Sequence, residues 1–390
     1  MEKMRVGVIG LGDICHVYLT TLNRFSDVVI LEACAARSLK KAKKKAEQYG
    51  IRKAYGSPEE LIADPEVDLV LNLTTPDVHA KFNRMALEAG KHVYSEKPLA
   101  ATFAEAEEIM QLAQEKGLTV GCAPDTFLGA RFQTVRELLD QGAIGEITGA
   151  TAFCAYHGGE TFHPNPAFFY QPGAGPLKDM GPYYMTALLS LLGPVHRCCA
   201  MSKRTYPTRT ITSQPLYGQE IPVNVDTYTT GLMEFDSGAL ATVLFSFDIW
   251  DSELPRIELY GTKGTICIRD IDPLSGPNLF GGEIWMRTEQ EYRWNSNPRK
   301  PGETAREWIN VPITRPFAST SHQDNGRGIG LVDLVLGMQE GREPRASGRM
   351  ALHSLEVMEG MFESAESGQF YLPHTTFEVP ALLPEQFGAE

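Results

Sequence analysis

Cysteine is scarce in this sequence, and its spacing excludes two classes of small domain. The 390 residues contain seven cysteines, and no two of them have the CxxC spacing of zinc knuckles. An odd number of scattered thiols also argues against a disulfide framework. We therefore expect no bound metal, and we expect buried, reduced cysteines of the kind found in cytoplasmic proteins.

The sequence also lacks an excess of positive charge and lacks long apolar runs. Lys and Arg number 36 against 49 Asp and Glu, a net charge of −13. This argues against a nucleic acid partner but leaves a local basic pocket open. The longest apolar candidate, 185–193, stops well short of the ~18 residues that a membrane span needs. Asp13 and His16 interrupt the apolar N-terminal run, so we expect no secretory signal and a cytoplasmic protein without a membrane partner.

The first 125 residues alternate apolar, β-rich runs with amphipathic segments. This alternation predicts a parallel sheet covered by helices on both faces, an α/β domain over residues 1–125. The expected strands are 5–10, 28–35, 67–73, 92–96 and 118–123. The expected helices are 14–25, 38–50, 57–64, 77–90 and 102–117.

The pattern changes in residues 126–390. Two β-rich runs flank Asp236-Ser237-Gly238 within 225–249, and a second such pair lies at 255–270, so hairpins and a mainly antiparallel sheet are predicted. The stretch 271–326 is rich in Pro, Gly and Asn and is expected to be irregular. A final amphipathic helix is predicted at 347–368. We expect one α+β domain here, with the alternative that its C-terminal helices pack back on the first domain.

A glycine-rich turn follows the first expected strand and opens the first expected helix: Gly10, Leu11, Gly12, Asp13 and Ile14. In this context Gly10 permits a tight turn, and Gly12 lets the backbone approach a pyrophosphate at the helix N-terminus. Cys15 stands in place of a third glycine and is small enough for close helix packing. The turn favours a dinucleotide site over a plain strand-to-helix connection.

The second expected strand indicates which dinucleotide is bound. An NAD-binding protein usually has an acidic residue here for the ribose hydroxyls, but this sequence has Ala36. Arg37, Ser38 and Lys41 follow, and a guanidinium, a hydroxyl and an ammonium suit a 2′-phosphate. We therefore expect NADP, with NAD as the alternative if these residues are only a solvated helix face.

Two further strand ends carry polar residues that are expected at the cofactor edge of the sheet. Thr74, Thr75 and Pro76 close the third expected strand, and His79 follows at the start of a helix. We give His79 a structural or cofactor-contact role and no catalytic role. A cap or a surface position is the alternative.

Glu96, Lys97 and Pro98 follow the fourth expected strand and are the strongest catalytic candidates of this half. A lysine desolvated beside an oxidised nicotinamide has its pKa lowered toward the value that a general base needs. Glu96 can orient the lysine or contact the cofactor ribose. Pro98 favours an extended backbone at Lys97, and a cis peptide bond is possible between them. The same tripeptide elsewhere would be a surface turn.

Asp179 and Tyr183 are four residues apart and would share one face of a helix. Gly181 and Pro182 lie between them and make the helical register uncertain. Both side chains are candidates for one cleft. The alternative is that Asp179 caps the helix and that Tyr183 packs in the core.

Taken together, the glycine turn, "TTPDVHA", "SEKPLA", "LLDQGAIGEI" and "GPLKDMGPYY" resemble the Gfo/Idh/MocA oxidoreductases over nearly the whole chain. The resemblance implies a Rossmann domain followed by an open-faced α+β domain, through whose sheet such proteins often oligomerise. It places the catalytic lysine on Lys97 and the substrate-binding aspartate on Asp179. The usual histidine of the family falls on Tyr183, which is a departure.

Other residues are weaker candidates for the substrate pocket. His157 and His163 could compensate for the missing histidine, and Asp125 and Arg131 follow the first domain closely. The expected reaction is the reversible oxidation of a secondary alcohol on a sugar, polyol or glycoside, in a homodimer or homotetramer. Two alternatives stay open, namely a redox-assisted glycosidase or lyase and a non-catalytic dinucleotide-binding sensor.

Overall fold

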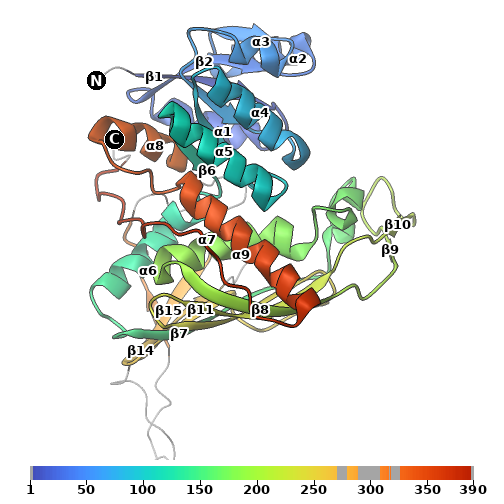
Figure 1. Ribbon diagram of the computed structural model, residues 1–390, viewed down its shortest axis with the longest axis vertical. Helices are drawn as coiled ribbons and strands as arrows, with labels where there is room; N and C mark the ends of the chain where they lie inside the picture. The colour runs from blue at the N-terminus through green and yellow to red at the C-terminus, as the bar shows by residue number, and fades with distance from the viewer. Residues whose placement is uncertain (1–2, 270–278, 289–307, 316, 318–325, 388–390) are drawn as a thin grey trace, which may run out of the picture. The chain divides into compact units, whose positions relative to one another are not determined.

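A computed structural model describes residues 3–269, 279–288, 308–315, 317 and 326–387. The chain forms two compact units (Figure 1). Unit 1 comprises Met1–Leu128, Gln323–Glu359 and Pro373–Glu390, and unit 2 comprises Gly129–His322 and Gly360–Leu372. Two C-terminal segments therefore belong to the first unit.

Unit 1 contains a six-stranded parallel sheet in the order β3-β2-β1-β4-β5-β6. This is the doubly wound order of dinucleotide-binding domains, in which the strand order reverses beside β1. The strands are nearly continuous apolar runs because helices cover both faces. Their bounds are β1 Met4–Ile9, β2 Val29–Ala35, β3 Lys53–Tyr55, β4 Leu69–Asn72, β5 His92–Ser95 and β6 Val120–Cys122.

The helices of unit 1 begin where the sequence offers polar caps. Ser38, Ser57 and Thr102 each accept a backbone N–H of the helix that follows, and Thr102 forms a capping box with Glu105. The helices are α1 Cys15–Arg24, α2 Leu39–Tyr49, α3 Pro58–Ile62, α4 Pro76–Glu88, α5 Phe103–Lys116, η1 Thr126–Leu128 and α8 Ile329–Glu340. A further helix, α9 Gly348–Ser367, runs from unit 1 into unit 2.

Unit 2 contains an eight-stranded mixed sheet in the order β16-β15-β14-β13-β7-β12-β11-β8. All its pairs are antiparallel except β7 with β12. The strands are β7 Ile147–Ala155, β8 Val195–Lys203, β11 Tyr228–Phe235, β12 Leu240–Ser246, β13 Ile257–Gly261, β14 Gly264–Arg269, β15 Glu283–Thr288 and β16 Ile309–Val311. A separate ribbon pairs β9 Thr208–Thr210 with β10 Glu220–Pro222.

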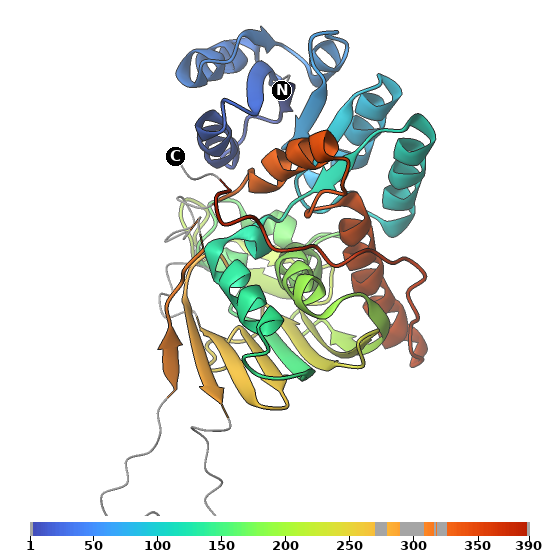
Figure 2. The same cartoon turned by 90° about the vertical axis from the view of Figure 1, so that its left-hand side faces the viewer.

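Helices cover one face of the unit 2 sheet. Helix α7, Pro176–Leu192, packs on β7, β11 and β12, and α6, Ala130–Asp140, packs on β15 (Figure 2). Two short helical turns, η2 Gly159–Thr161 and η3 Pro166–Tyr170, follow β7. Met201, Leu232 and Leu240 are large apolar side chains that remain exposed on the strands.

The structure confirms the predicted fold class, a parallel α/β sheet followed by a mainly antiparallel α+β sheet. Both expected hairpins form, with β11 paired to β12 and β13 to β14. One expectation is wrong: the stretch 271–326 contains β15 and β16, which pair with the sheet edge. Short β3 was also missed, because three half-buried residues carry too little periodicity.

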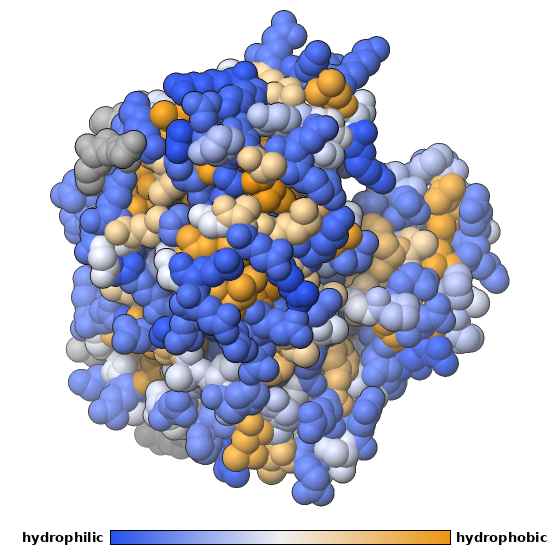
Figure 3. Space-filling view, turned by 45° about the horizontal axis from the view of Figure 1, so that its top comes forward, coloured by the Kyte–Doolittle hydropathy of each residue, from blue (hydrophilic) through white to orange (hydrophobic). Residues whose placement is uncertain are grey.

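The surface in Figure 3 is mostly hydrophilic, with small separate apolar patches. None of the helices within the described ranges is both long and apolar enough to cross a membrane.

Candidate active site

The glycine turn of unit 1 has the geometry that a dinucleotide requires. Gly10 has φ of 86°, and a Cβ there would lie 2.4 Å from the Leu73 carbonyl oxygen, so only glycine fits. A Cβ on Gly12 would meet no atom within 4 Å, so the space beside the helix N-terminus is open. The residues therefore fit a pyrophosphate held by the first amides of α1.

Cys15 begins α1 and is completely buried. Burial raises the pKa of its thiol, so the side chain is a neutral packing group rather than a reactive one. Its complete burial agrees with the close helix packing that a small residue permits at this position.

The end of β2 forms a basic corner. Ala36 is buried where an acidic residue would stand, while Arg37, Ser38 and Lys41 are exposed. The Ser38 hydroxyl oxygen accepts the Lys41 backbone N–H at 3.4 Å and keeps its own O–H for a ligand. Neither Arg37 nor Lys41 forms an ion pair with another residue in the described part of the chain. Two cationic groups and a hydroxyl thus lie next to one helix N-terminus.

A buried polar network fixes the loop after β4. Asn72 accepts the backbone N–H of Thr74 at 3.1 Å and its hydroxyl at 2.6 Å, and donates to Asn83 at 2.8 Å. His79 lies between two loops, with Nδ1 2.7 Å from the Pro98 carbonyl oxygen and Nε2 2.9 Å from the Thr74 carbonyl oxygen. Both contacts are hydrogen bonds only when both ring nitrogens carry protons.

His79 therefore joins the loop after β4 to the loop after β5. Thr75 and Pro76 lie in the first of these loops, where Pro76 is the first residue of α4. A structural role is one of the two that the sequence analysis gave His79, the other being contact with the cofactor. Contacts of Thr74, Thr75, Pro76 and His79 with a cofactor stay a prediction.

Glu96 holds the backbone of the expected catalytic lysine. Its Oε2 accepts the Lys97 backbone N–H at 2.9 Å, and its Oε1 accepts the Tyr18 hydroxyl at 2.8 Å. The Arg327 guanidinium lies 3.9 Å from Oε1. The Lys97-Pro98 peptide bond is cis. The carboxylate thus acts first on the protein itself, by fixing the backbone at Lys97.

The carboxylate of Asp125, like that of Glu96, accepts hydrogen bonds from within unit 1. It accepts them from the Tyr94 hydroxyl and from the backbone N–H groups of Gly328 and Gly330. These bonds attach the end of β6 to the beginning of α8. Burial raises the pKa of Asp125 to about 6, although the three hydrogen bonds oppose that shift. Both oxygens are occupied within unit 1, which favours a structural over a substrate-binding role.

In unit 2, α7 continues through Gly181 and Pro182, so Asp179 and Tyr183 are one helical turn apart. The Thr186 hydroxyl donates to the Pro182 carbonyl oxygen at 2.7 Å at this point of the helix. Asp179 is half-buried in the first turn, and Tyr183 is buried with its ring 6.1 Å from Phe280. The two side chains thus share one stripe of α7.

The structure adds a phenol to this group. Tyr156, one residue beyond the end of β7, has a pKa raised well above its usual range by burial and, next, by the carboxylate of Asp179. Tyr156 therefore lies close enough to Asp179 for the charge of the carboxylate to affect the pKa of the phenol. Periodicity could not reveal this pair because β7 and α7 approach each other only in the folded unit.

The remaining candidates have local partners. His157 Nε2 lies 3.2 Å from Arg209 Nη1. His163 Nδ1 accepts the Asn165 backbone N–H at 3.0 Å, and its ring packs against two phenylalanines. Arg131 is buried and donates to the Leu279 carbonyl oxygen at 2.7 Å. A substrate contact for any of them stays a prediction.

Tyr18, Arg327 and Tyr156 were missed by the sequence reasoning. Tyr18 looks like an ordinary core residue of an amphipathic helix, and Arg327 lies 231 positions after Glu96 (327 − 96). No local sequence pattern connects residues so far apart, so nothing in the sequence could have indicated that Arg327 lies beside Glu96.

The sheet order, the glycine turn and the polar strand ends define an NAD(P)-dependent oxidoreductase. Two family models agree with this class: "Oxidoreductase family, NAD-binding Rossmann fold" matches residues 4–123, and "GFO/IDH/MocA C-terminal domain" matches residues 132–267. The chain belongs to the Gfo/Idh/MocA oxidoreductase family, which confirms the resemblance of its motifs.

Similar proteins cover nearly the whole chain. D-xylose 1-dehydrogenase (NADP(+)) 2 of Haloferax volcanii is 25% identical over 342 residues, 86% of this chain and 90% of that protein. An NAD binding oxidoreductase from Klebsiella pneumoniae superposes with a TM-score of 0.79 at 22% identity, covering 95% of this chain and 99% of the other. Levoglucosan dehydrogenase in its apo form gives a TM-score of 0.77 at 19% identity, covering 96% and 100%.

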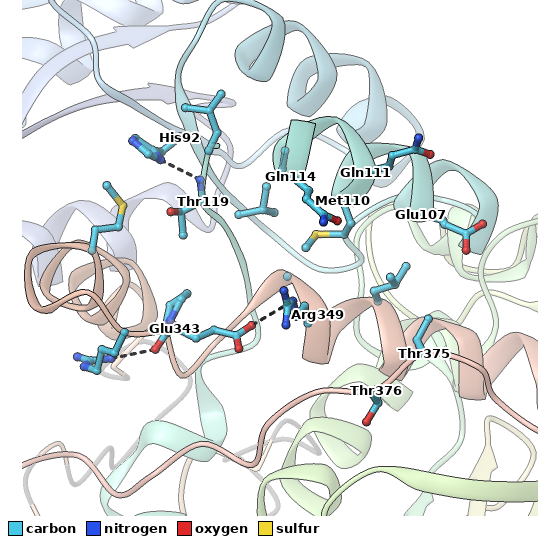
Figure 4. A pocket seen from close by; sticks show the side chains of 18 of the residues that line it. His92, Glu107, Met110, Gln111, Gln114, Thr119, Glu343, Arg349, Thr375 and Thr376 are labelled. Carbon is cyan, nitrogen blue, oxygen red and sulfur yellow. Dashed lines mark hydrogen bonds and ion pairs between the residues drawn. The ribbon is translucent and has the colours of Figure 1, made fainter. Parts of the chain in front are cut away.

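Unit 1 has a concave region away from the carboxyl ends of its strands. This groove of about 970 Å³ begins beside the amino ends of β5 and β6, at His92 and Thr119 (Figure 4). Its charged groups have partners: Arg349 lies 3.8 Å from Glu343, and Arg342 bonds Asp333 at 2.8 Å. The charged side chains of its lining are therefore already engaged in ion pairs, as is Glu107 with His374 at 3.3 Å.

The two glycines of the turn give a matched pair of substitutions. Gly10→Ala should lower the free energy of unfolding by about 2 to 4 kcal/mol, because a Cβ at positive φ meets the Leu73 backbone. Gly12→Ala should leave stability within about 0.5 kcal/mol, yet weaken nucleotide binding at least tenfold by filling the open space. Urea denaturation without cofactor and calorimetric titration with NADP and NAD measure both. Normal nucleotide binding by Gly12→Ala would contradict the assignment of the turn.

Asp125 predicts a pH dependence of stability. Its folded-state pKa of about 6 exceeds the ordinary value of 3.8, so the folded protein binds more protons between these values. Its contribution to the free energy of unfolding should therefore fall as the pH rises from about 4 to about 6. Urea denaturation should show the stability difference between wild type and Asp125→Asn shrinking over this range. A constant difference would show that the carboxyl titrates normally.

Proposed function

We propose that the protein catalyses the reversible NAD(P)-dependent oxidation of a secondary alcohol to a ketone on a sugar, polyol or glycoside. The named relatives support a sugar-like substrate, since one acts by its name on D-xylose and another on levoglucosan. The observation that carries the proposal is the fixed position of Lys97 at the carboxyl end of β5, where dinucleotides bind in sheets of this order.

Lys97 is the proposed general base. A bound nicotinamide would supply the hydride acceptor for the alcohol carbon. Lys97 Nζ takes the hydroxyl proton in the oxidative direction and returns it in the reductive direction. Glu96 keeps the backbone of Lys97 in place, and His79 holds the Pro98 carbonyl that follows. The backbone at Lys97 is therefore fixed from both sides before substrate binds.

Asp179 and Tyr183 are the proposed substrate-binding pair of unit 2. Asp179 accepts a hydroxyl next to the reacting carbon, and the Tyr183 phenol takes the place of the family histidine as a proton donor or acceptor. Tyr156, close to Asp179, is a third group that could hydrogen-bond the sugar. A phenol differs from an imidazole in its pKa, so the pH profile would differ from that of relatives with histidine.

NADP is the proposed cofactor. The exposed side chains of Arg37, Ser38 and Lys41 suit the 2′-phosphate, and Ala36 offers nothing to a ribose hydroxyl. We also propose a homo-oligomer formed through the open face of the unit 2 sheet, where Met201, Leu232 and Leu240 are exposed.

Replacing Lys97 tests the chemistry. Lys97→Met should lower kcat/KM by about 10²- to 10⁴-fold while NADP affinity stays within about threefold, because only the proton acceptor is lost. Asp179→Asn should raise KM and lower kcat. If the two residues act on one substrate, the double variant should lose much less than the product of the single losses. Turnover over a panel of sugars and polyols, followed by cofactor absorbance, measures this. Near-normal turnover by Lys97→Met would refute the assignment.

Replacing Arg37 tests the choice of cofactor. Arg37→Ala should weaken NADP binding by about 10- to 100-fold and leave NAD binding unchanged, because a charged hydrogen bond to phosphate contributes roughly 1.5 to 3 kcal/mol. Lys44→Ala, exposed farther along the same helix, is the matched control and should change neither affinity. A wild-type preference for NAD would contradict the proposal.

A further inference from the structure

Three large aromatic side chains of unit 2 are exposed to solvent in the loops beyond β7 and β12. Trp250 is 79% exposed, Phe162 61% and Phe168 50%. Single exposed apolar residues are ordinary, but β7 and β12 pair in parallel, so the loops that carry these rings leave the sheet at the same edge. The proposed chemistry of Lys97 and Asp179 makes no use of them.

Trp250 is held in a fixed orientation. Its ring stacks on His157 with centroids 3.5 Å apart and planes 11° apart. His157 in turn lies 3.2 Å from Arg209 Nη1, and the buried Arg209 bonds Glu160 at 3.0 Å and the Phe247 carbonyl oxygen at 2.6 Å. One face of the indole is therefore supported by a buried ionic network, which leaves the other face to solvent.

The hydrogen bonding of His157 indicates its protonation. A guanidinium can only donate, so Nε2 accepts from Arg209 and the proton of the neutral ring is on Nδ1. Burial, and next the charge of Arg209, lower the pKa of His157, in agreement with a neutral ring. Nδ1 has no hydrogen-bond partner among the residues that the structure describes. A buried N–H without an acceptor is costly, and an enclosed water molecule would relieve that cost.

The exposed rings connect to the proposed substrate residues of the same unit. Tyr156 precedes His157, and the charge of Asp179 raises the pKa of the Tyr156 phenol. Its ring is 5.1 Å from Phe247, which is 6.1 Å from Phe169, and Phe169 packs against both Phe162 and Phe168. A continuous series of rings therefore leads from the carboxylate of Asp179 to the exposed phenylalanines.

The surroundings of Trp250 suit a sugar ring better than a protein surface. Asp251 and Glu253 are exposed on the same loop, and their carboxylates can accept sugar hydroxyls. The C–H groups on the flat face of a pyranose are weakly positive and pack on the negative face of an indole. The core of a protein–protein interface is instead depleted of charged residues such as these two carboxylates.

We propose that Trp250, supported by His157, is a stacking subsite for a second sugar ring, so that the preferred substrate is a glycoside of two or more rings rather than a free monosaccharide. This inference rests on the proposed function, because it adds a subsite next to the residues that bind the reacting ring. The stacked ring takes no part in hydride or proton transfer. It contributes binding energy through contact alone.

Paired substrates test the subsite. With xylobiose and cellobiose, Trp250→Ala should lower kcat/KM at least tenfold, and with xylose and glucose it should stay within twofold of wild type. Trp250→Phe, which keeps an aromatic face, should recover part of the loss. Phe370→Ala is the matched control, because Phe370 is 55% exposed in the same unit and lies outside the series of rings. Equal losses on both substrate classes, or none, would overturn the inference.

A binding measurement separates this inference from the proposed reaction. Saturation-transfer NMR with the same disaccharides should show contact with the wild-type protein and its loss in Trp250→Ala, even if no sugar is turned over. Absence of disaccharide binding to wild type would overturn the subsite. Light scattering gives a further check: if Trp250→Ala dissociates an oligomer while disaccharide kinetics are unchanged, the ring belongs to an interface between copies and the subsite is refuted.

Discussion

The carboxylate of Glu96 is the constraint on which the proposed catalytic edge of unit 1 depends. It binds the Lys97 backbone N–H with one oxygen and the Tyr18 hydroxyl with the other. Carboxylates are expensive to bury, and such a group is retained where its hydrogen bonds are satisfied. The result is a lysine whose backbone is fixed from an adjacent helix rather than left to a mobile turn.

The same principle recurs at the neighbouring strand ends. Asn72 and His79 bond backbone groups of the loop after β4, His79 and Asn83 bond carbonyls of the loop after β5, and Asp125 joins the end of β6 to α8. Parallel strands end at one edge of the sheet, where their backbone groups need partners. Buried polar side chains supply them and make the edge rigid enough to hold a dinucleotide.

Local patterns predicted much of this structure. The alternation of apolar runs and capped helices gave the parallel sheet of unit 1, and the Asp236-Ser237-Gly238 turn gave the β11–β12 hairpin. The tight turn at Gly10 was predicted correctly because a positive φ depends only on the residues of the turn itself. The strands β15 and β16 were missed because their pairing depends on the rest of the sheet and their own sequence reads as a loop.

The sequence by itself determined the fold class, the family, and the residue types that can carry the chemistry, since periodicity, turn residues and motif order are properties of short segments. Only the tertiary structure decided that Glu96 meets Tyr18 and Arg327, that Asp125 supports α8, and that His157 supports Trp250. These pairs unite residues from distant parts of the chain. Such contacts form only when packing brings their elements together, so no local pattern can specify them.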